Sequence, residues 1–150
     1  LGADVPYCLK GGTMLASGIG EVLHPLSALP RTAIVIVKPP FSVSTPTIYH
    51  KMDNTVIERH PDISLLTNAL EQKDVKTLAQ NLVNVMEEVT VSMHPVIGRI
   101  KASLLAGGAL GACMSGSGPS VFALFDRYET AKKAAAAFKN RFFTYVGWTK

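Results

Sequence analysis

The stretch that most constrains the fold is a run of serine and glycine set between two apolar segments. Ser115-Gly116-Ser117-Gly118-Pro119 follows residues 112–114 and precedes residues 120–125. Glycine lacks a Cβ and adopts positive φ freely, so consecutive N–H groups can turn toward one anion. The pattern predicts two strands joined by an anion-binding turn that ends before Pro119, which has no N–H. An ordinary loop before a strand explains the same residues.

A second distinctive stretch lies at the amino terminus. Gly2-Ala3-Asp4-Val5-Pro6 is followed by Gly11-Gly12. A carboxylate beside small residues lets a substrate approach acid and backbone together. Aspartate is also a common helix cap and turn residue, so Asp4 has a structural explanation as well. His24 has no second ligand at a suitable spacing, which favours a surface or structural histidine over a metal ligand. We predict no metal ligands in this chain.

Length and composition favour one globular domain. The 150 residues are 47% hydrophobic and 17% charged, a composition typical of folded chains. Cys8 and Cys113 each lie in an apolar stretch, which predicts buried, reduced thiols and a cytoplasmic protein. The longest apolar runs, such as residues 33–37, are far shorter than the ~20 residues that cross a bilayer. We therefore expect no membrane partner.

The net charge of +4 raises the question of nucleic acid. The fifteen Lys and Arg residues are scattered, and the densest group is Lys132, Lys133, Lys139 and Arg141 on one predicted helix. No basic strand interleaved with aromatic residues accompanies them, which favours a solvated helix face and no nucleic-acid partner. A phosphate-rich substrate fits the positive charge equally well.

The first half of the chain predicts a hairpin, a strand and a helix. Residues 13–16 and 21–24 flank a glycine-containing loop, as in a β-hairpin. Residues 31–38 form a β-branched run that ends at Pro39-Pro40. Ser44 or Thr45 can cap a helix that reaches residue 52 or 53, with Pro46 in its first turn.

The second half predicts helices followed by strands. Helices are expected at residues 62–71, 75–89 and 95–106, and the middle one has the clearest apolar stripe. After the strands around the glycine run, Asp126 and Glu129 resemble a capping box for a further helix. Residues 143–148 form a last strand. The order of elements predicts an α+β fold in which helices cover an antiparallel sheet.

Taken together, three motifs carry a family resemblance. Gly2-Ala3-Asp4-Val5-Pro6, residues 37–49 with Val43-Ser44-Thr45-Pro46, and Ser115-Gly116-Ser117-Gly118 resemble the carboxy-terminal half of the GHMP family of small-molecule kinases. The likeness extends over nearly the whole chain. It implies a carboxy-terminal substrate-side domain at residues 31–150 with a sheet of about four strands. Residues 1–30 would be a hairpin remnant of the nucleotide-binding lobe.

The resemblance implies roles for particular residues. Asp4 corresponds to the family's catalytic carboxylate, which accepts or orients the proton of the acceptor hydroxyl. Ser115, Gly116, Ser117 and Gly118 correspond to a phosphate-binding loop. No histidine or lysine is placed to activate either serine as a nucleophile.

Two further residues are implied on the substrate side. Thr45 would offer its hydroxyl to the methylerythritol or diphosphate portion of the substrate, and Tyr49 an aromatic face near a cytosine pocket. Helix capping is the structural alternative for Thr45, and core packing is the alternative for Tyr49.

The implied activity is ATP-dependent phosphorylation of the 2-hydroxyl of 4-diphosphocytidyl-2-C-methyl-D-erythritol, in non-mevalonate isoprenoid precursor biosynthesis. Mg²⁺ would accompany the ATP. Another GHMP kinase, of the homoserine or mevalonate type, is one alternative. A non-catalytic α+β module that binds a metabolite or RNA is another, since one fold serves many functions.

One family motif is absent from these residues. GHMP kinases bind ATP through an earlier glycine- and serine-rich loop that opens a helix, and nothing like Pro-x-x-x-Gly-Leu-Gly-Ser-Ser occurs here. We therefore expect a fragment that needs the missing amino-terminal half of the same protein. Alone, it should neither bind ATP tightly nor turn over.

Overall fold

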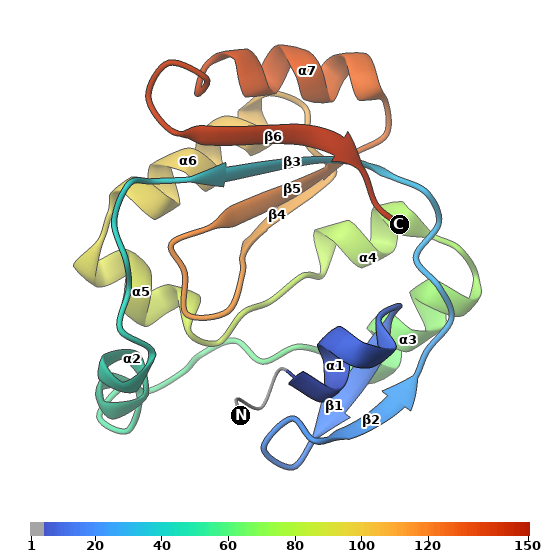
Figure 1. Cartoon of the computed structure of the whole chain (residues 1–150), viewed down its shortest axis with the longest axis vertical. Coiled ribbons are helices and arrows are strands. Elements are labelled where there is room, and N and C mark those ends of the chain that lie inside the picture. Colours follow the sequence, from blue (N-terminus) through green and yellow to red (C-terminus); the bar gives the residue numbers. More distant parts are fainter. Residues whose placement is uncertain (1–4) are drawn as a thin grey trace.

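The computed structural model describes residues 5–150, and within them the chain forms a four-stranded sheet, a two-stranded hairpin and seven helices (Figure 1). In chain order the elements are α1 (Val5–Lys10), β1 (Met14–Ser17), β2 (Val22–Pro25), β3 (Ala33–Lys38), α2 (Thr45–Met52), α3 (Ile63–Glu71), α4 (Val75–Gln80), α5 (Glu87–Met93), α6 (Val96–Ala106), β4 (Gly111–Met114), β5 (Val121–Phe125), α7 (Tyr128–Ala136) and β6 (Phe143–Trp148).

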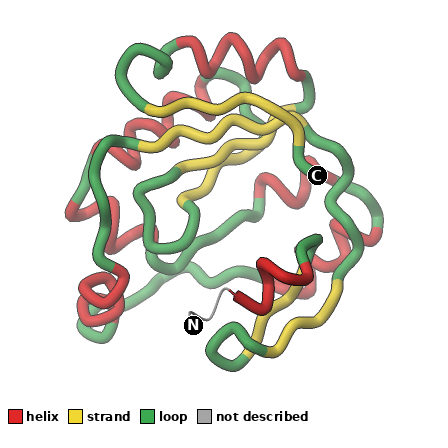
Figure 2. Tube along the Cα trace, in the orientation of Figure 1, coloured by secondary structure: helices red, strands yellow, loops and turns green. Residues whose placement is uncertain are grey.

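The larger sheet has the strand order β4-β5-β3-β6, and all neighbours are antiparallel. Figure 2 shows these strands side by side in one layer. The β-branched strand β3 lies inside the sheet, where Ile36 is opposite Phe122 of β5 on one side and Tyr145 of β6 on the other. The predicted α+β fold with an antiparallel sheet of four strands is confirmed.

The main core lies between one face of this sheet and helices α6 and α7 (Figure 1). Alternate residues of the strands point into it, as the two-residue period of a strand requires. Its fully buried members include Val35, Phe125, Ile97, Leu104 and Ala131. A second cluster on the opposite face joins α3 and α4 to Leu124.

Gly111 lets α4 approach the sheet closely. A Cβ built at this position would lie 1.8 Å from the carbonyl oxygen of Ala79. Any side chain there would force the carboxyl end of α4 away from β4. The packing between α4 and β4 therefore requires a residue without a side chain at position 111.

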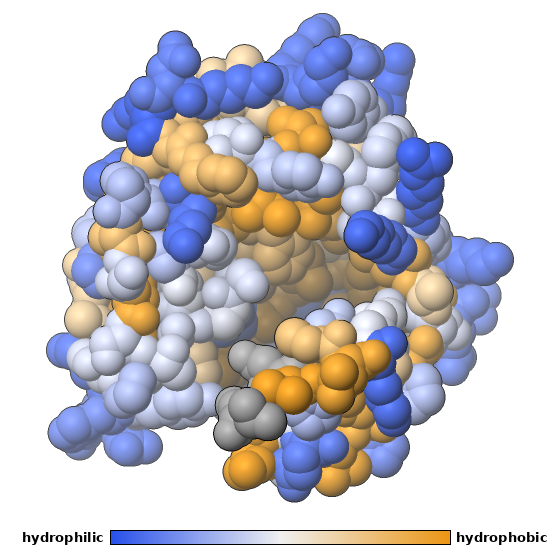
Figure 3. Space-filling model, in the orientation of Figure 1, coloured by the Kyte–Doolittle hydropathy of each residue, from blue (hydrophilic) through white to orange (hydrophobic). Residues whose placement is uncertain are grey.

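The hairpin β1–β2 stands apart from the larger sheet. Within residues 5–150 its two strands pair only with each other, from Met14 opposite Pro25 to Ser17 opposite Val22. This confirms the predicted hairpin. Figure 3 shows a hollow between the hairpin and the larger sheet, with apolar atoms along its floor.

The predicted helix over residues 75–89 is wrong, because the chain breaks it into α4 and α5. Two asparagines account for the break. The Asn81 side chain donates to the carbonyl of Thr77, and the Asn84 carboxamide bonds backbone groups outside any helix. Such side chains compete with the helical hydrogen bonds that the apolar stripe alone would favour.

Two smaller predictions are also wrong. Cys8 is exposed, whereas Cys113 is buried as expected. Helix α7 begins after Arg127 without a side-chain cap, so Asp126 and Glu129 do not form a capping box. By contrast, Ser44 caps α2 and Asp62 caps α3 through side-chain oxygens. Among residues 5–150, none of the helices has the length and apolar character needed to span a membrane.

The core packing predicts that two Phe→Ala substitutions lower the free energy of unfolding by unequal amounts. Phe125 is fully buried and Phe143 is 68% exposed. We expect Phe125→Ala to lower the free energy of unfolding by about 3–5 kcal/mol, because it leaves a cavity. Phe143→Ala should cost less than about 1 kcal/mol. Urea denaturation of both variants is the measurement, and equal losses would contradict this account of the core.

Candidate functional site

The serine-glycine run forms the turn between β4 and β5 and uses part of its hydrogen-bonding capacity internally. The N–H of Ser115 donates to Ser120 O at 2.8 Å, and the N–H of Gly118 donates to Ser115 O at 3.0 Å. The N–H groups of Gly116 and Ser117 have no acceptor among residues 5–150. Gly116 and Gly118 have φ of +56° and +92°, which glycine adopts without strain. Two N–H groups therefore remain for an anion.

The side chain of Asn84 holds the start of this turn in place through hydrogen bonds. Its Nδ2 donates to Met114 O and to Gly116 O, each at 2.8 Å, and its Oδ1 accepts from the N–H of Met86 at 2.9 Å. Three hydrogen bonds fix the carboxamide in one orientation. The side chain thus ties the start of the turn to the residues just before α5.

Two residues of α5 complete the support. The hydroxyl of Thr90, which is fully buried, donates to Ser117 O at 3.2 Å. Glu87 accepts from the N–H of Met114 at 2.8 Å and forms an ion pair with Lys101 of α6. The turn is consequently anchored at both ends by side chains from one segment.

The same cluster sets the chemistry of Cys113. Burial, reinforced by the negative charge of Glu87, raises the pKa of this thiol from 9.0 to about 11. Burial has this effect because a thiolate loses hydration that a neutral thiol does not need. At neutral pH Cys113 is therefore a neutral, apolar part of the wall behind the turn.

The first residue of helix α2 also contacts the turn. The hydroxyls of Thr45 and Ser117 lie 2.8 Å apart, although the two residues are 72 positions apart in the sequence. Ser44, not Thr45, is the cap of α2, because its hydroxyl oxygen accepts from the backbone N–H of Thr47. The capping alternative for Thr45 is therefore wrong, and its hydroxyl is directed to the turn instead.

Tyr49 lies on an accessible face of α2. It is 54% exposed, while its neighbour Ile48 is fully buried. The core-packing alternative for Tyr49 is wrong, and its ring is free to contact a ligand. Asp4, the predicted catalytic carboxylate, lies outside the described residues.

Asn84, Glu87 and Thr90 were not singled out from the sequence. They lie within or next to the residues 75–89, where the apolar stripe predicted one long helix. That pattern gave no indication that their side chains bind the turn. Asn84 offers the signal that could have found it, since asparagine is disfavoured inside helices. In the described part of the chain, no group of three His, Cys, Asp or Glu residues is placed to hold a metal ion.

The described residues thus form an α+β domain. Its antiparallel sheet carries a supported glycine turn, and this turn contacts the start of a helix with an exposed tyrosine. Residues 66–144 match the family described as "GHMP kinases C terminal". The chain belongs to the GHMP kinase family and carries its carboxy-terminal domain.

Relatives and solved structures agree with this membership. A protein of Lachnoclostridium phytofermentans named 4-diphosphocytidyl-2-C-methyl-D-erythritol kinase is 50% identical over 139 residues, which cover 93% of this chain and 48% of that protein. A crystal structure of 4-(cytidine 5'-diphospho)-2C-methyl-D-erythritol kinase superposes with a TM-score of 0.80 at 28% identity, covering 98% of this chain and 53% of that one.

The fold is shared more widely than that one kinase. Homoserine kinase from Cytophaga hutchinsonii superposes with a TM-score of 0.73 at 23% identity, over 97% of this chain and 50% of that one. At this identity the likeness shows the fold alone. The chain spans about half the length of the curated relatives it matches.

Asn84 predicts a specific effect on the turn. Asn84→Ala leaves Met114 O and Gly116 O without their donor, and we expect a loss of about 1–3 kcal/mol in unfolding free energy. Amide exchange of the turn should accelerate. Asn54→Ala, at an exposed asparagine whose Nδ2 also donates to a carbonyl, is the matched control and should cost less than about 0.5 kcal/mol. Equal losses in the two variants would show that Asn84 does not anchor the turn.

The two cysteines should differ in reactivity. At pH 8 the buried Cys113, with its pKa near 11, is almost entirely a neutral thiol, and the thiolate is the reactive form. A thiol-specific chromogenic disulfide reagent should therefore label one cysteine per folded chain quickly. Cys8→Ser should abolish that fast phase and Cys113→Ser should not. Rapid labelling of both thiols in the folded chain would contradict the assignment.

Proposed function

We propose that this chain is the substrate-side part of an ATP-dependent kinase that phosphorylates the 2-hydroxyl of 4-diphosphocytidyl-2-C-methyl-D-erythritol. The observation that carries the proposal is the contact between Thr45 and Ser117. It joins the helix that carries Tyr49 to the turn with two available N–H groups. The names of the relatives that match over most of the chain support the choice of substrate.

In the proposed reaction, the glycine turn stabilises the transferring phosphoryl group. The N–H groups of Gly116 and Ser117 would donate to its oxygens, and the supports from Asn84 and Thr90 keep these donors in place before the substrate arrives. Preorganised donors of this kind act where negative charge concentrates in the transition state. The chain therefore contributes positioning and charge stabilisation rather than a nucleophile.

Asp4 would supply the acid–base chemistry. The oxygen of the 2-hydroxyl attacks the γ-phosphorus of ATP, the bond to the β-phosphate oxygen breaks, and Asp4 accepts or orients the hydroxyl proton. Tyr49 would lie against the cytosine ring, since flat aromatic faces stack on bases. Mg²⁺ would enter with the nucleotide. Because the described residues offer no set of ligands for it, we assign none of them to the ion.

The amino-terminal part of the chain belongs, in this proposal, to the nucleotide-binding lobe. Residues 1–30 include the hairpin β1–β2, whose strands lack further partners within residues 5–150. Leu9 and Ile19 are each 83% exposed there. Exposed apolar groups and free strand edges are typical of surfaces that another part of a protein covers. A preceding nucleotide-binding lobe of the same protein would cover them and supply the ATP-binding loop.

The experiment uses the full-length protein. Asp4→Asn should lower kcat about 100-fold or more while the dissociation constant for the cytidine substrate changes little. Asp53→Asn, at the exposed end of α2, is the matched control and should leave both quantities unchanged. A loss of affinity as large as the loss of kcat, or full activity in Asp4→Asn, would contradict the assigned role.

A competition assay tests the substrate. Cytidine diphosphate should inhibit the full-length enzyme competitively with its alcohol substrate, and Tyr49→Ala should weaken that inhibition about tenfold, the equivalent of losing one stacked base. Thr55→Ala, on the turn after α2, is the control. A kinase of the homoserine or mevalonate type would be indifferent to cytidine diphosphate, and that result would overturn the choice of substrate.

A further inference from the structure

A separate pocket lies between α2 and α5, and the proposed function does not use it. Its volume is about 810 Å³, and Thr47, His50 and Lys51 of α2 face Val89 and Ser92 of α5 across it. Thr45 and Tyr49 are not among the residues that line it. A cavity of a few hundred to a thousand cubic ångströms is typical of small-molecule sites.

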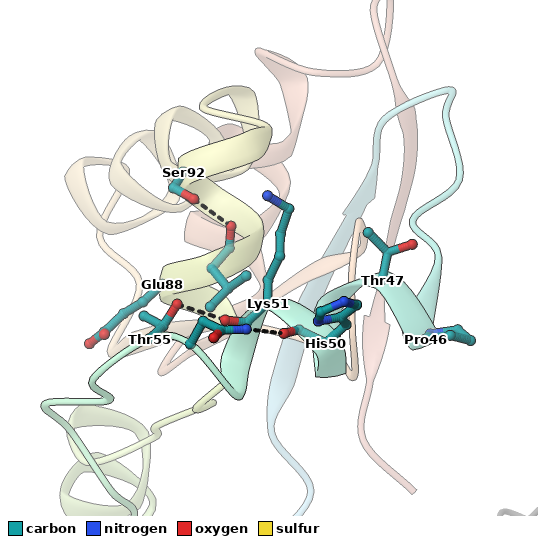
Figure 4. A pocket seen from close by; sticks show the side chains of 9 residues that line it. Pro46, Thr47, His50, Lys51, Thr55, Glu88 and Ser92 are labelled. Atoms are coloured by element: carbon teal, nitrogen blue, oxygen red, sulfur yellow. Dashed lines mark hydrogen bonds between the residues drawn. The ribbon is translucent and has the colours of Figure 1, made fainter.

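The polar groups of this α2–α5 pocket favour an anionic ligand. Within residues 5–150 neither His50 nor Lys51 has a carboxylate within ion-pair distance. Figure 4 shows the Lys51 ammonium reaching along α5 toward Ser92, while the Glu88 carboxylate points away from it. Among residues 5–150, the Lys51 ammonium therefore lines the pocket without an ion-pair partner.

Hydroxyl groups on both walls add hydrogen-bonding capacity. The Ser92 hydroxyl donates to Val89 O at 2.7 Å, and that of Thr47 donates to Ser44 at 2.9 Å. Each hydroxyl proton is used, which leaves oxygen lone pairs as acceptors for a ligand's own hydroxyls. A ligand that carries both a phosphate and hydroxyl groups matches this combination of a cation and acceptors.

Both walls of the pocket are connected to the glycine turn at one residue. Thr45, at the start of α2, contacts the Ser117 hydroxyl, and Thr90 of α5 donates to the Ser117 carbonyl. A change in the spacing of α2 and α5 would therefore act on Ser117 through these two bonds. Hydrogen-bond networks of this kind can carry coupling between sites.

We propose that the α2–α5 pocket is an effector site for a small phosphorylated polyol, and that its occupancy alters the glycine turn through Thr45 and Ser117. The binding part stands apart from the kinase proposal, because it is measured without turnover. The consequence for phosphoryl transfer rests on the proposed function. The two can therefore fail separately.

The binding test is a titration of the isotope-labelled 150-residue chain with glycerol 3-phosphate, followed by backbone amide chemical shifts. Saturable shifts are expected at His50, Lys51 and Ser92. Lys51→Ala should weaken the affinity at least fivefold, and Lys133→Ala, an exposed lysine on α7, should leave it within twofold. Uncharged glycerol should produce no saturable shift. Shifts confined to residues 115–118, or equal affinities in the two lysine variants, would overturn the site.

The coupling test uses Thr45→Val, which removes the hydroxyl and keeps the shape of the side chain. Glycerol 3-phosphate should still bind the pocket of this variant within twofold of the original affinity. The accompanying shifts at Gly116 and Ser117 should fall by more than half. Lys51→Ala removes those shifts too if they arise from the pocket, whereas direct binding at the turn would preserve them. Preserved shifts in either variant would overturn the coupling.

Discussion

The structure depends on how one short turn is held between two strands. Asn84 binds its carbonyl groups, Glu87 binds the strand that leads into it, and Thr90 binds its far end. All three side chains come from one short segment, residues 84–90, in which Asn84 precedes α5 and the other two lie in its first turns. Because these polar partners are provided, a turn rich in glycine keeps one conformation without using its own N–H groups at Gly116 and Ser117.

Much of the fold followed from local patterns in the sequence. The β-branched run that forms β3, a cap of α2 at Ser44 or Thr45, and the strands on either side of the glycine turn were all predicted. These features depend on neighbours in the chain, so a local pattern reveals them. The helix predicted over residues 75–89 was wrong because the hydrogen bonds of Asn84 reach residues 30 and 32 positions away. Local periodicity carries no information about such partners.

The candidate site was predictable only in part. The motifs predicted Thr45 and Ser117 as site residues. No spacing rule, however, indicates that residues 72 positions apart share a hydrogen bond. For Tyr49 the sequence allowed two roles, core packing and ligand contact, because it does not indicate which face of α2 packs inward. Ile48 takes that place, which exposes Tyr49. The roles of Asn84, Glu87 and Thr90 in supporting the turn could be identified only from the three-dimensional structure.

The central claim is that Gly116 and Ser117 present free N–H groups to a phosphoryl group while α2 presents Tyr49 to the base. The most direct test is a crystal structure of the full-length protein with the cytidine substrate and a non-hydrolysable ATP analogue. We predict phosphate oxygens about 3 Å from both nitrogens and the Tyr49 ring against the cytosine. Phosphates bound elsewhere, with these two N–H groups facing solvent or protein carbonyls, would contradict the account.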